Sequence, residues 1–237
     1  DRKSPAIGNF SYRQTLATIF KKPNIMTIEK LFDLLDDWRN LPSYQLERRA
    51  DIFFALHLET ISRKLLGAEI DLIIPEFPVR VGEISEKIPE LNKSFKIDYL
   101  LYSKSSQKVY LVELKTDQRS LREKQDWYLE SAAKIKVSGL IDGLLKIYSA
   151  TQQKTKYDRL LEKLEKIHWI ERNDKTIKNL NCNIEPEVIY IQPLNPESKK
   201  NVLSFDNIIS AFSDIEEPLT KRFKESLEKW QSDTNKK

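Results

Sequence analysis

Two carboxylates and an amine interrupt the apolar, strand-like sequence in the middle of the chain. Residues 95–129 read FKIDYLLYSKSSQKVYLVELKTDQRSLREKQDWYL, and the interrupting side chains are those of Asp98, Glu113 and Lys115. Glu113 and Lys115 are two positions apart, so both point to the same face of a strand. Carboxylate oxygens are the ligands that Mg²⁺ and Mn²⁺ prefer, and an amine beside them could contact a bound water or a phosphate. The residue types therefore indicate chemistry on a phosphate group, assisted by a divalent cation.

The spacing of the two acids predicts that they meet across a β-hairpin. Residues 96–102 and 109–115 are rich in Ile, Val, Leu and Tyr, and the polar link Ser103–Lys108 suits a hairpin loop. If the hairpin closes symmetrically at the middle of this link, Asp98 lies opposite Glu113, with Cβ atoms roughly 4.5–5.5 Å apart. Two carboxylates at that distance repel, and a bound divalent cation would reverse the sign of that interaction. A slip of one residue would place Asp98 on the wrong face of the sheet.

The composition is that of a globular domain with a mild excess of basic residues. The chain has 237 residues, 40% of them hydrophobic, and its 40 Lys and Arg are mixed among 36 Asp and Glu, giving a net charge of +4. This balance is compatible with a nucleic-acid partner but does not require one. We expect a single domain, with an N-terminal helical arm over residues 1–43, a core over 44–192 and a C-terminal helical extension over 193–237.

Cysteine content and hydropathy bear on where the protein works. The single cysteine, Cys182, excludes an internal disulfide framework and a cysteine-rich zinc site, and it suits a reducing interior. No apolar run approaches the roughly 20 residues that span a membrane, and no secretion signal is visible. We therefore expect a cytoplasmic protein without a membrane partner.

The pattern of apolar residues predicts an α/β fold. Helices are expected at 27–40, 44–66, 121–133, 135–149, 154–169, 205–212 and 219–230, strands within 69–80 and at 96–102, 109–115 and 188–192, and loops at 81–94 and 172–186. The prolines Pro75 and Pro78 mark the first strand as an edge or bulged strand. The last strand returns after a helical crossover, so the sheet should be mixed, with helices packed on it.

The helix expected at 44–66 carries two acids that could serve a site beside the sheet. Its apolar stripe places Glu47 at the edge and Glu59 away from the centre, so Glu47 is the better candidate. Glu47 could equally be a solvated first-turn acid that favours the helix dipole. His57 falls on the stripe and is expected to be a core histidine. The other residues predicted to be buried along this helix are Leu46, Ala50, Ile52, Phe53, Phe54, Ala55, Leu56, Ile61 and Leu65.

The central stretch resembles the PD-(D/E)XK nuclease superfamily, which has the restriction-endonuclease-like fold. The resemblance rests on Asp98, on Glu113–Leu114–Lys115 starting fifteen positions later, and on a following helix that bears Gln125. The expected αβββαβ order over residues 44–192 agrees with the common core of that superfamily. Ile97 stands where the family name has proline, and Tyr128 lies one residue closer to the glutamine than in the pattern of the RecB-related members.

The resemblance assigns roles to these residues. It implies that Asp98, Glu113 and the carbonyl of Leu114 bind Mg²⁺ or Mn²⁺, and that a helix acid, here Glu47, assists. Asp98 and Glu113 would then be catalytic through the metal. Lys115 would be catalytic by orienting the attacking water or stabilising the phosphate.

Gln125 would be catalytic by holding the scissile strand or the lysine.

A second E-x-K, Glu197–Lys199, lies in a proline-flanked polar stretch without a strand pattern, and we interpret it as exposed loop charge.

The resemblance implies a metal-dependent nuclease that hydrolyses phosphodiester bonds, with DNA as the expected substrate. Cutting both strands would favour a homodimer. The alternatives are a catalytically inactive nucleic-acid-binding or assembly module with the same fold, a generic α/β scaffold, and a structural ion pair at a strand end. The sequence is compatible with DNA or RNA as substrate and with endo- or exonuclease action, and it does not indicate a sequence specificity.

Overall fold

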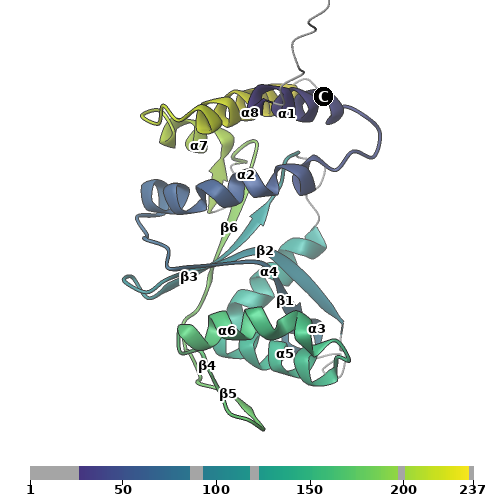
Figure 1. The fold of residues 1–237 in the computed structure, drawn as a ribbon, viewed down its shortest axis with the longest axis vertical. Helices are drawn as coiled ribbons and strands as arrows, with labels where there is room; N and C mark the ends of the chain where they lie inside the picture. Colours follow the sequence, from purple (N-terminus) through teal and green to yellow (C-terminus); the bar gives the residue numbers. More distant parts are fainter. Residues whose placement is uncertain (1–26, 86–92, 118–122, 197–200, 235–237) are drawn as a thin grey trace, which may run out of the picture.

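The computed structural model describes residues 27–85, 93–117, 123–196 and 201–234 (Figure 1). Most of the expected N-terminal arm and the second E-x-K, Glu197–Lys199, lie outside these residues. The helices are α1 (Ile28–Trp38), α2 (Leu46–Ile61) with its π-helical continuation η1 (Ser62–Leu66), α3 (Val81–Ile84), α4 (Glu123–Lys134), α5 (Lys136–Ala150), the 3₁₀ turn η3 (Lys154–Tyr157), α6 (Asp158–Lys166), α7 (Phe205–Ala211) and α8 (Pro218–Thr234). The strands are β1 (Leu72–Arg80), β2 (Ser94–Ser103), β3 (Lys108–Leu114), β4 (Ile170–Arg172), β5 (Ile177–Asn179), β6 (Glu187–Gln192) and β7 (Val202–Ser204).

The centre of the fold is a five-stranded mixed sheet in the order β1-β2-β3-β6-β7. β1, β2 and β3 are antiparallel neighbours, whereas β3–β6 and β6–β7 are parallel pairs. The predicted α/β fold with a mixed sheet flanked by helices is confirmed. The proline-bearing β1 is an edge strand, as Pro75 and Pro78 predicted, and the apolar β6 is an interior strand.

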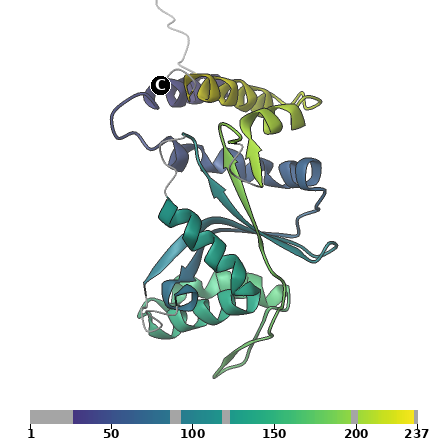
Figure 2. The same ribbon diagram turned by 180° about the vertical axis from the view of Figure 1, so that it is seen from behind.

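Helices cover both faces of the sheet (Figures 1 and 2), and an apolar core lies between the helices and the sheet on each face. One core joins the sheet to α4, α5 and α6. Its members include Leu111 of β3, Leu129 of α4 and Leu144 of α5. The other core joins the opposite face to α1, α2, α7 and α8, where Phe54 and Phe223 meet edge to face with ring centroids 5.0 Å apart. A functional group at the end of a central strand can therefore be reached from both helical layers.

The register of the β2–β3 hairpin is the predicted one. The pairs include Tyr102–Val109, Leu100–Leu111 and Tyr99–Val112, so opposed residue numbers sum to 211 as symmetrical closure requires. The ladder ends at Tyr99–Val112. Asp98 and Glu113 are next in line but do not continue it, which corrects the expectation that they would be a regular opposed pair.

The side-chain alternation of β2 slips by one residue at Asp98. Ile97 and Leu100, three positions apart, both belong to the core on the α4–α6 side, while Tyr99 belongs to the other core. In β1, Pro75 pairs with Tyr99 and Phe77 with Ile97, so Glu76 is the residue that falls opposite Asp98. Glu76 has a left-handed backbone, with φ of 53°. The two strands therefore kink together at this point, which turns Asp98 toward the end of β3.

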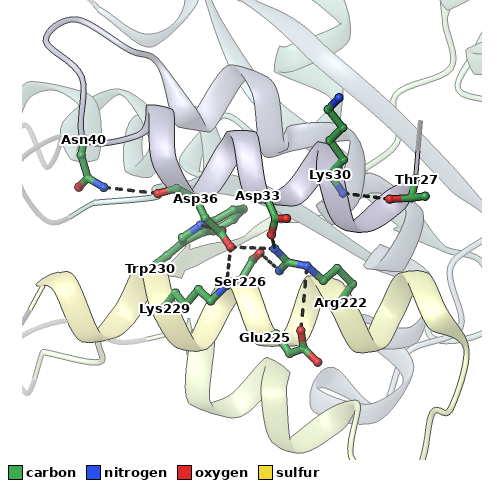
Figure 3. A network of polar contacts seen from close by, with 10 residues as sticks. All are labelled: Thr27, Lys30, Asp33, Asp36, Asn40, Arg222, Glu225, Ser226, Lys229 and Trp230. Carbon is green, nitrogen blue, oxygen red and sulfur yellow. Dashed lines mark hydrogen bonds and ion pairs between the residues drawn. The ribbon is translucent and has the colours of Figure 1, made fainter. Parts of the chain in front are cut away.

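The first and last described helices lie side by side and are joined by a polar network (Figure 3). The Arg222 guanidinium of α8 donates to Asp33 Oδ1 at 2.8 Å and to Asp36 Oδ2 at 3.0 Å, both on α1. Asp36 also accepts from Lys229 Nζ at 2.9 Å and from the Trp230 indole nitrogen at 2.8 Å. We call Asp33, Asp36, Arg222, Ser226, Lys229 and Trp230 the α1–α8 network.

Several predicted elements are wrong. The expected loop 172–186 contains β5, which pairs with β4 in a separate two-stranded sheet. The expected helix 154–169 divides into η3 and α6 and ends at Lys166, because His168 has φ of 58° and turns Trp169 back into the core. The expected loop 81–94 begins with α3, and β7 was not predicted. Ile52 and Leu56 of α2 are exposed rather than buried.

Within the described residues, no helix combines the length and the apolar character that spanning a bilayer demands.

Candidate functional site

Glu113 and Lys115 lie at the carboxyl end of β3, in the middle of the sheet. The Lys115 backbone N–H donates to the Ile191 carbonyl of β6 at 2.8 Å, so the parallel pairing with β6 extends one residue past β3. Both side chains are almost completely buried, with 1% of Glu113 and 4% of Lys115 exposed. Burying two charges costs several kcal/mol each unless partners compensate. Their partners therefore decide what this position can do.

The Lys115 ammonium is surrounded by oxygen atoms. Its Nζ donates to Glu113 Oε1 at 2.5 Å and to the Leu114 carbonyl at 3.0 Å, and it lies 3.6 Å from Glu47 Oε2. The Gln125 side-chain amide of α4 also donates to Glu113 Oε1. Glu113 is thus held from two sides, by the lysine on its own strand and by the first described turn of α4.

Asp98 reaches the same position from β2. Its Oδ2 accepts from the Leu114 backbone N–H at 2.7 Å, in place of a strand-to-strand backbone bond. The kink at Asp98 makes this contact available, since the β2–β3 ladder has already ended at Tyr99. The carboxylate therefore sits where the two strands separate, next to the Leu114 peptide and in the electrostatic range of Lys115 and Glu113.

Glu47 comes from the other helical layer. It lies in the first turn of α2 and is half-buried, whereas Glu59 is exposed. Between the two acids considered on this helix, Glu47 is the one that lies near Lys115. We call Glu47, Asp98, Glu113, Lys115 and Gln125 the strand-end cluster.

Negative charge is in excess in the strand-end cluster. Burial raises the pKa of Glu113 to about 7; the nearby Asp98 charge adds to this rise, and Lys115 opposes it. Burial likewise raises the pKa of Asp98 and the pKa of Glu47 above their usual values. For Lys115, burial lowers the pKa, but the surrounding carboxylates of Glu113, Glu47 and Asp98 outweigh it and the net shift is upward. Three acids thus share one amine among the described residues.

The donor set fits a hard divalent cation. Asp98 and Glu113 offer carboxylate oxygens and Leu114 offers a carbonyl oxygen, which are the groups that Mg²⁺ and Mn²⁺ bind. Over the described residues, no group of three or more His, Cys, Asp or Glu side chains is gathered closely enough to hold a metal ion. Asp98, Glu113 and the Leu114 carbonyl are the groups that could hold such a cation, with Glu47 nearby, and Mg²⁺ usually keeps several waters as its remaining ligands.

Gln125 and Tyr128 of α4 are both half-buried. Gln125 contacts Glu113, as described above. Tyr128 instead stacks on Phe95 of β2, with ring centroids 4.9 Å apart and an interplanar angle of 19°. Its ring therefore packs α4 against the sheet.

His57 is a core histidine, as predicted. Its Nε2 is 2.9 Å from Thr220 Oγ1 and its Nδ1 is 2.7 Å from the Phe53 carbonyl. The imidazole packs between the rings of Phe212 and Phe223 in the core of the α1, α2, α7 and α8 layer. These contacts account for both ring nitrogens.

Gln192, the last residue of β6, was not singled out in the sequence. It is 2% exposed, and by the β3–β6 register it lies beside Lys115. A weak signal was present: a polar residue ends the apolar run Val188–Gln192, where an interior strand normally continues to bury apolar groups.

Comparison of the chain with models of protein families, with curated proteins and with solved structures gave no match in any of the three cases.

Proposed function

We propose that this chain is a metal-dependent nuclease of the PD-(D/E)XK type, with a restriction-endonuclease-like core, that hydrolyses phosphodiester bonds of DNA. The observation that carries the proposal is the strand-end cluster, in which Glu113 and Glu47 pair with one buried lysine and Asp98 lies within its electrostatic range. An excess of buried negative charge is costly unless a cation or a proton compensates it. The order α2, β1, β2, β3, α4 and β6 supports the proposal through its agreement with the αβββαβ core.

Each residue has a role in this proposal. Asp98, Glu113 and the Leu114 carbonyl would hold Mg²⁺, with Glu47 assisting from α2. A bound Mg²⁺ supplies Lewis-acid stabilisation of the phosphate and lowers the pKa of a coordinated water.

The lysine and the glutamine act directly from the protein. Lys115 places an ammonium group beside Glu113 and the Leu114 carbonyl, where it can orient a water or stabilise charge on a phosphate oxygen. Gln125 fixes the Glu113 carboxylate through its amide, so it is a positioning residue in the contacts of this structure.

A DNA cleavage assay tests the proposal. Linear, circular and single-stranded DNA, and RNA beside them, are incubated with Mg²⁺, Mn²⁺ or EDTA. We expect metal-dependent cleavage that EDTA stops and that Lys115→Met abolishes. Circular DNA separates endonuclease from exonuclease action.

The matched control is Lys64→Met. Lys64 also forms a lysine–carboxylate pair, with Asp214, but it lies on η1 and not in the strand-end cluster. Full activity in purified Lys115→Met would remove the catalytic assignment, and loss of activity in Lys64→Met would show that the assay reports general damage.

The second candidate is a nucleic-acid-binding or assembly module without catalysis. The observation that favours it is the close Lys115–Glu113 pair, which already neutralises one acid. Calorimetric titration with Mg²⁺ separates the two functions. A nuclease should bind the ion with heat that Asp98→Asn removes, and a module should show no such heat.

A further inference from the structure

Gln192 has a buried oxygen without a hydrogen-bond partner. Its Nε2 donates to the Leu194 carbonyl at 2.9 Å, which fixes the orientation of the amide group, because a carbonyl can only accept. The other end, Oε1, is buried and has no partner among the residues that the structure describes. An unsatisfied buried acceptor costs about 1–3 kcal/mol, so its presence calls for an explanation.

The neighbours of Gln192 in the sheet show which donor this oxygen could take. On the β7 side, Gln192 pairs with Ser204, whose hydroxyl donates to Asn207 Oδ1 at 2.9 Å in the capping box of α7. That donor is already used. On the β3 side, Lys115 lies beside Gln192. This follows because Leu114 pairs with Ile191 and the Lys115 backbone N–H donates to the Ile191 carbonyl.

Lys115 and Gln192 also point to the same face of the sheet. Tyr190 belongs to the core on the α4–α6 side, whereas Ile189 and Ile191 belong to the other core. By alternation, Gln192 shares the face of Tyr190. Glu113 faces α4, since it accepts from Gln125, and Lys115 is two residues further on.

The hydrogen bonds of Lys115 would have to change if a divalent cation occupied the strand-end cluster. An ammonium group has three N–H donors. Its two hydrogen-bond acceptors among the described residues are Glu113 and the Leu114 carbonyl. These are the same groups that the proposed function assigns to the cation. With the cation bound, Glu47 Oε2 at 3.6 Å would be the acid left beside the ammonium, and N–H groups of Lys115 would need new acceptors.

We propose that Gln192 is a further positioning residue of the site, whose buried amide oxygen accepts from Lys115 when a divalent cation engages Glu113 and the Leu114 carbonyl. The inference rests on the proposed function. It explains why a polar side chain ends an interior strand, and why one end of that side chain is anchored to Leu194 while the other is left for a donor. It adds β6 to the elements that shape the site.

Two variants of Gln192 isolate the acceptor oxygen. Gln192→Met and Gln192→Glu both lose the amide N–H that donates to Leu194, but only the glutamate keeps an acceptor at the position of Oε1. The Mg²⁺ affinity of each is measured by calorimetry, in the natural chain and in Lys115→Met. Thermal unfolding followed by circular dichroism checks that every variant is folded.

In the natural chain we expect Gln192→Met to weaken Mg²⁺ binding roughly 10- to 100-fold, the size of a hydrogen bond to a charged group, and Gln192→Glu to retain most of the affinity. In the Lys115→Met chain, Gln192→Met should leave the Mg²⁺ affinity unchanged, because that chain has no Lys115 ammonium group to donate to Gln192 Oε1. Cleavage by the natural chain and the two Gln192 variants should follow the same order.

The outcomes distinguish the two proposals. If the natural chain binds Mg²⁺ but Gln192→Met weakens binding equally with and without Lys115, or has no effect in either, the role of Gln192 is overturned and the nuclease proposal stands. If the natural chain binds neither Mg²⁺ nor Mn²⁺ and does not cleave, the proposed function fails and the role of Gln192 fails with it.

Discussion

The strand-end cluster and the α1–α8 network are partly buried ionic clusters that are built in opposite ways. In the α1–α8 network, the half-buried Asp36 receives hydrogen bonds from Arg222, Lys229 and Trp230. Burial alone would raise the pKa of Asp36, but these donors outweigh it and the pKa is lowered. In the strand-end cluster, the same kind of side chain shows the reverse, since the pKa values of Asp98, Glu113 and Glu47 are all raised.

The difference indicates what each cluster is for. In the α1–α8 network the charges are balanced by partners within the protein, so the network joins two helices and needs nothing further. In the strand-end cluster, three carboxylates are set against the single ammonium of Lys115, and this excess of negative charge is a cost to stability. Carboxylates with shifted pKa values that gather at one point are typical of functional sites, and this supports the proposed function of the strand-end cluster.

The largest contrast should come from removing one carboxylate charge in each cluster. We expect Asp98→Asn to lower cleavage at least about 10²- to 10³-fold, because a group that stabilises the developing charge is lost. Asp36→Asn should leave the cleavage rate of the folded protein unchanged. Steady-state cleavage rates are measured for both variants with matched amounts of folded protein. Equal losses of cleavage rate in the two variants would contradict the functional difference between the clusters.

For the free energy of unfolding, a large effect should instead come from a substitution in the α1–α8 network. Arg222→Met removes the cation that contacts Asp33 and Asp36, and we expect a loss of about 3 kcal/mol in the free energy of unfolding, as for other broken buried pairs. Arg159→Met, which breaks an exposed pair with Glu162, is the control and should have little effect. Urea unfolding gives both values. A loss for Arg222→Met no larger than that for Arg159→Met would contradict the structural role.

The two clusters should also respond oppositely to pH. The folded pKa of Glu113 is about 7, above the usual 4.5, so the folded protein binds more protons than the unfolded chain between these values. Its contribution to stability therefore falls as pH rises from about 4.5 to 7, and Glu113→Gln should reduce this decline in the free energy of unfolding by about 3 kcal/mol. The folded pKa of Asp36 is lower than its unfolded value of 3.8, so this group stabilises the fold above pH 3.8 and the stabilisation is lost as the pH falls. Asp36→Asn should therefore reduce the loss of stability at acid pH.

Unfolding free energies measured from pH 3 to 8 test this pair of expectations. The proposed contrast would be wrong if Glu113→Gln changed the unfolding free energy only at acid pH, or if Asp36→Asn changed it only near neutral pH.

The smallest effect concerns the start of α1. Thr27 caps this helix through Oγ1, which accepts from the Lys30 N–H at 3.2 Å. Thr27→Ala should lower the free energy of unfolding by about 1 kcal/mol without changing cleavage. Ser232→Ala, near the end of α8, serves as the surface control. A drop in cleavage by Thr27→Ala would mean that α1 influences the strand-end cluster.

The parts of the fold that the sequence predicted are those with a strong local pattern. The β2–β3 hairpin has two apolar runs of equal length around a polar link, and its register follows from that symmetry. The edge position of β1 follows from Pro75 and Pro78, which cannot donate to a neighbouring strand. Three-residue strands such as β5 and β7 are too short to show any alternation, which is why both were missed.

The site was predicted less completely than the fold. Asp98, Glu113 and Lys115 could be found from residue type and spacing, but the slip at Asp98 depends on the left-handed backbone of Glu76, for which the sequence gives no sign. Gln192 is brought to Lys115 by pairing between strands that are more than 70 positions apart in the chain. Contacts of this kind come from tertiary packing, and local patterns do not contain them.

The pairing of α1 with α8 has a consequence for how the molecule is made. Asp33 and Arg222 are 189 positions apart, so α1 must wait until at least that many further residues have been synthesised before its partner exists. During that interval the apolar side chains of α1 and α2, among them Phe32 and Phe54, have no α8 to cover them. A nascent chain halted before α8 should therefore be a good client for chaperones that bind exposed aromatic segments.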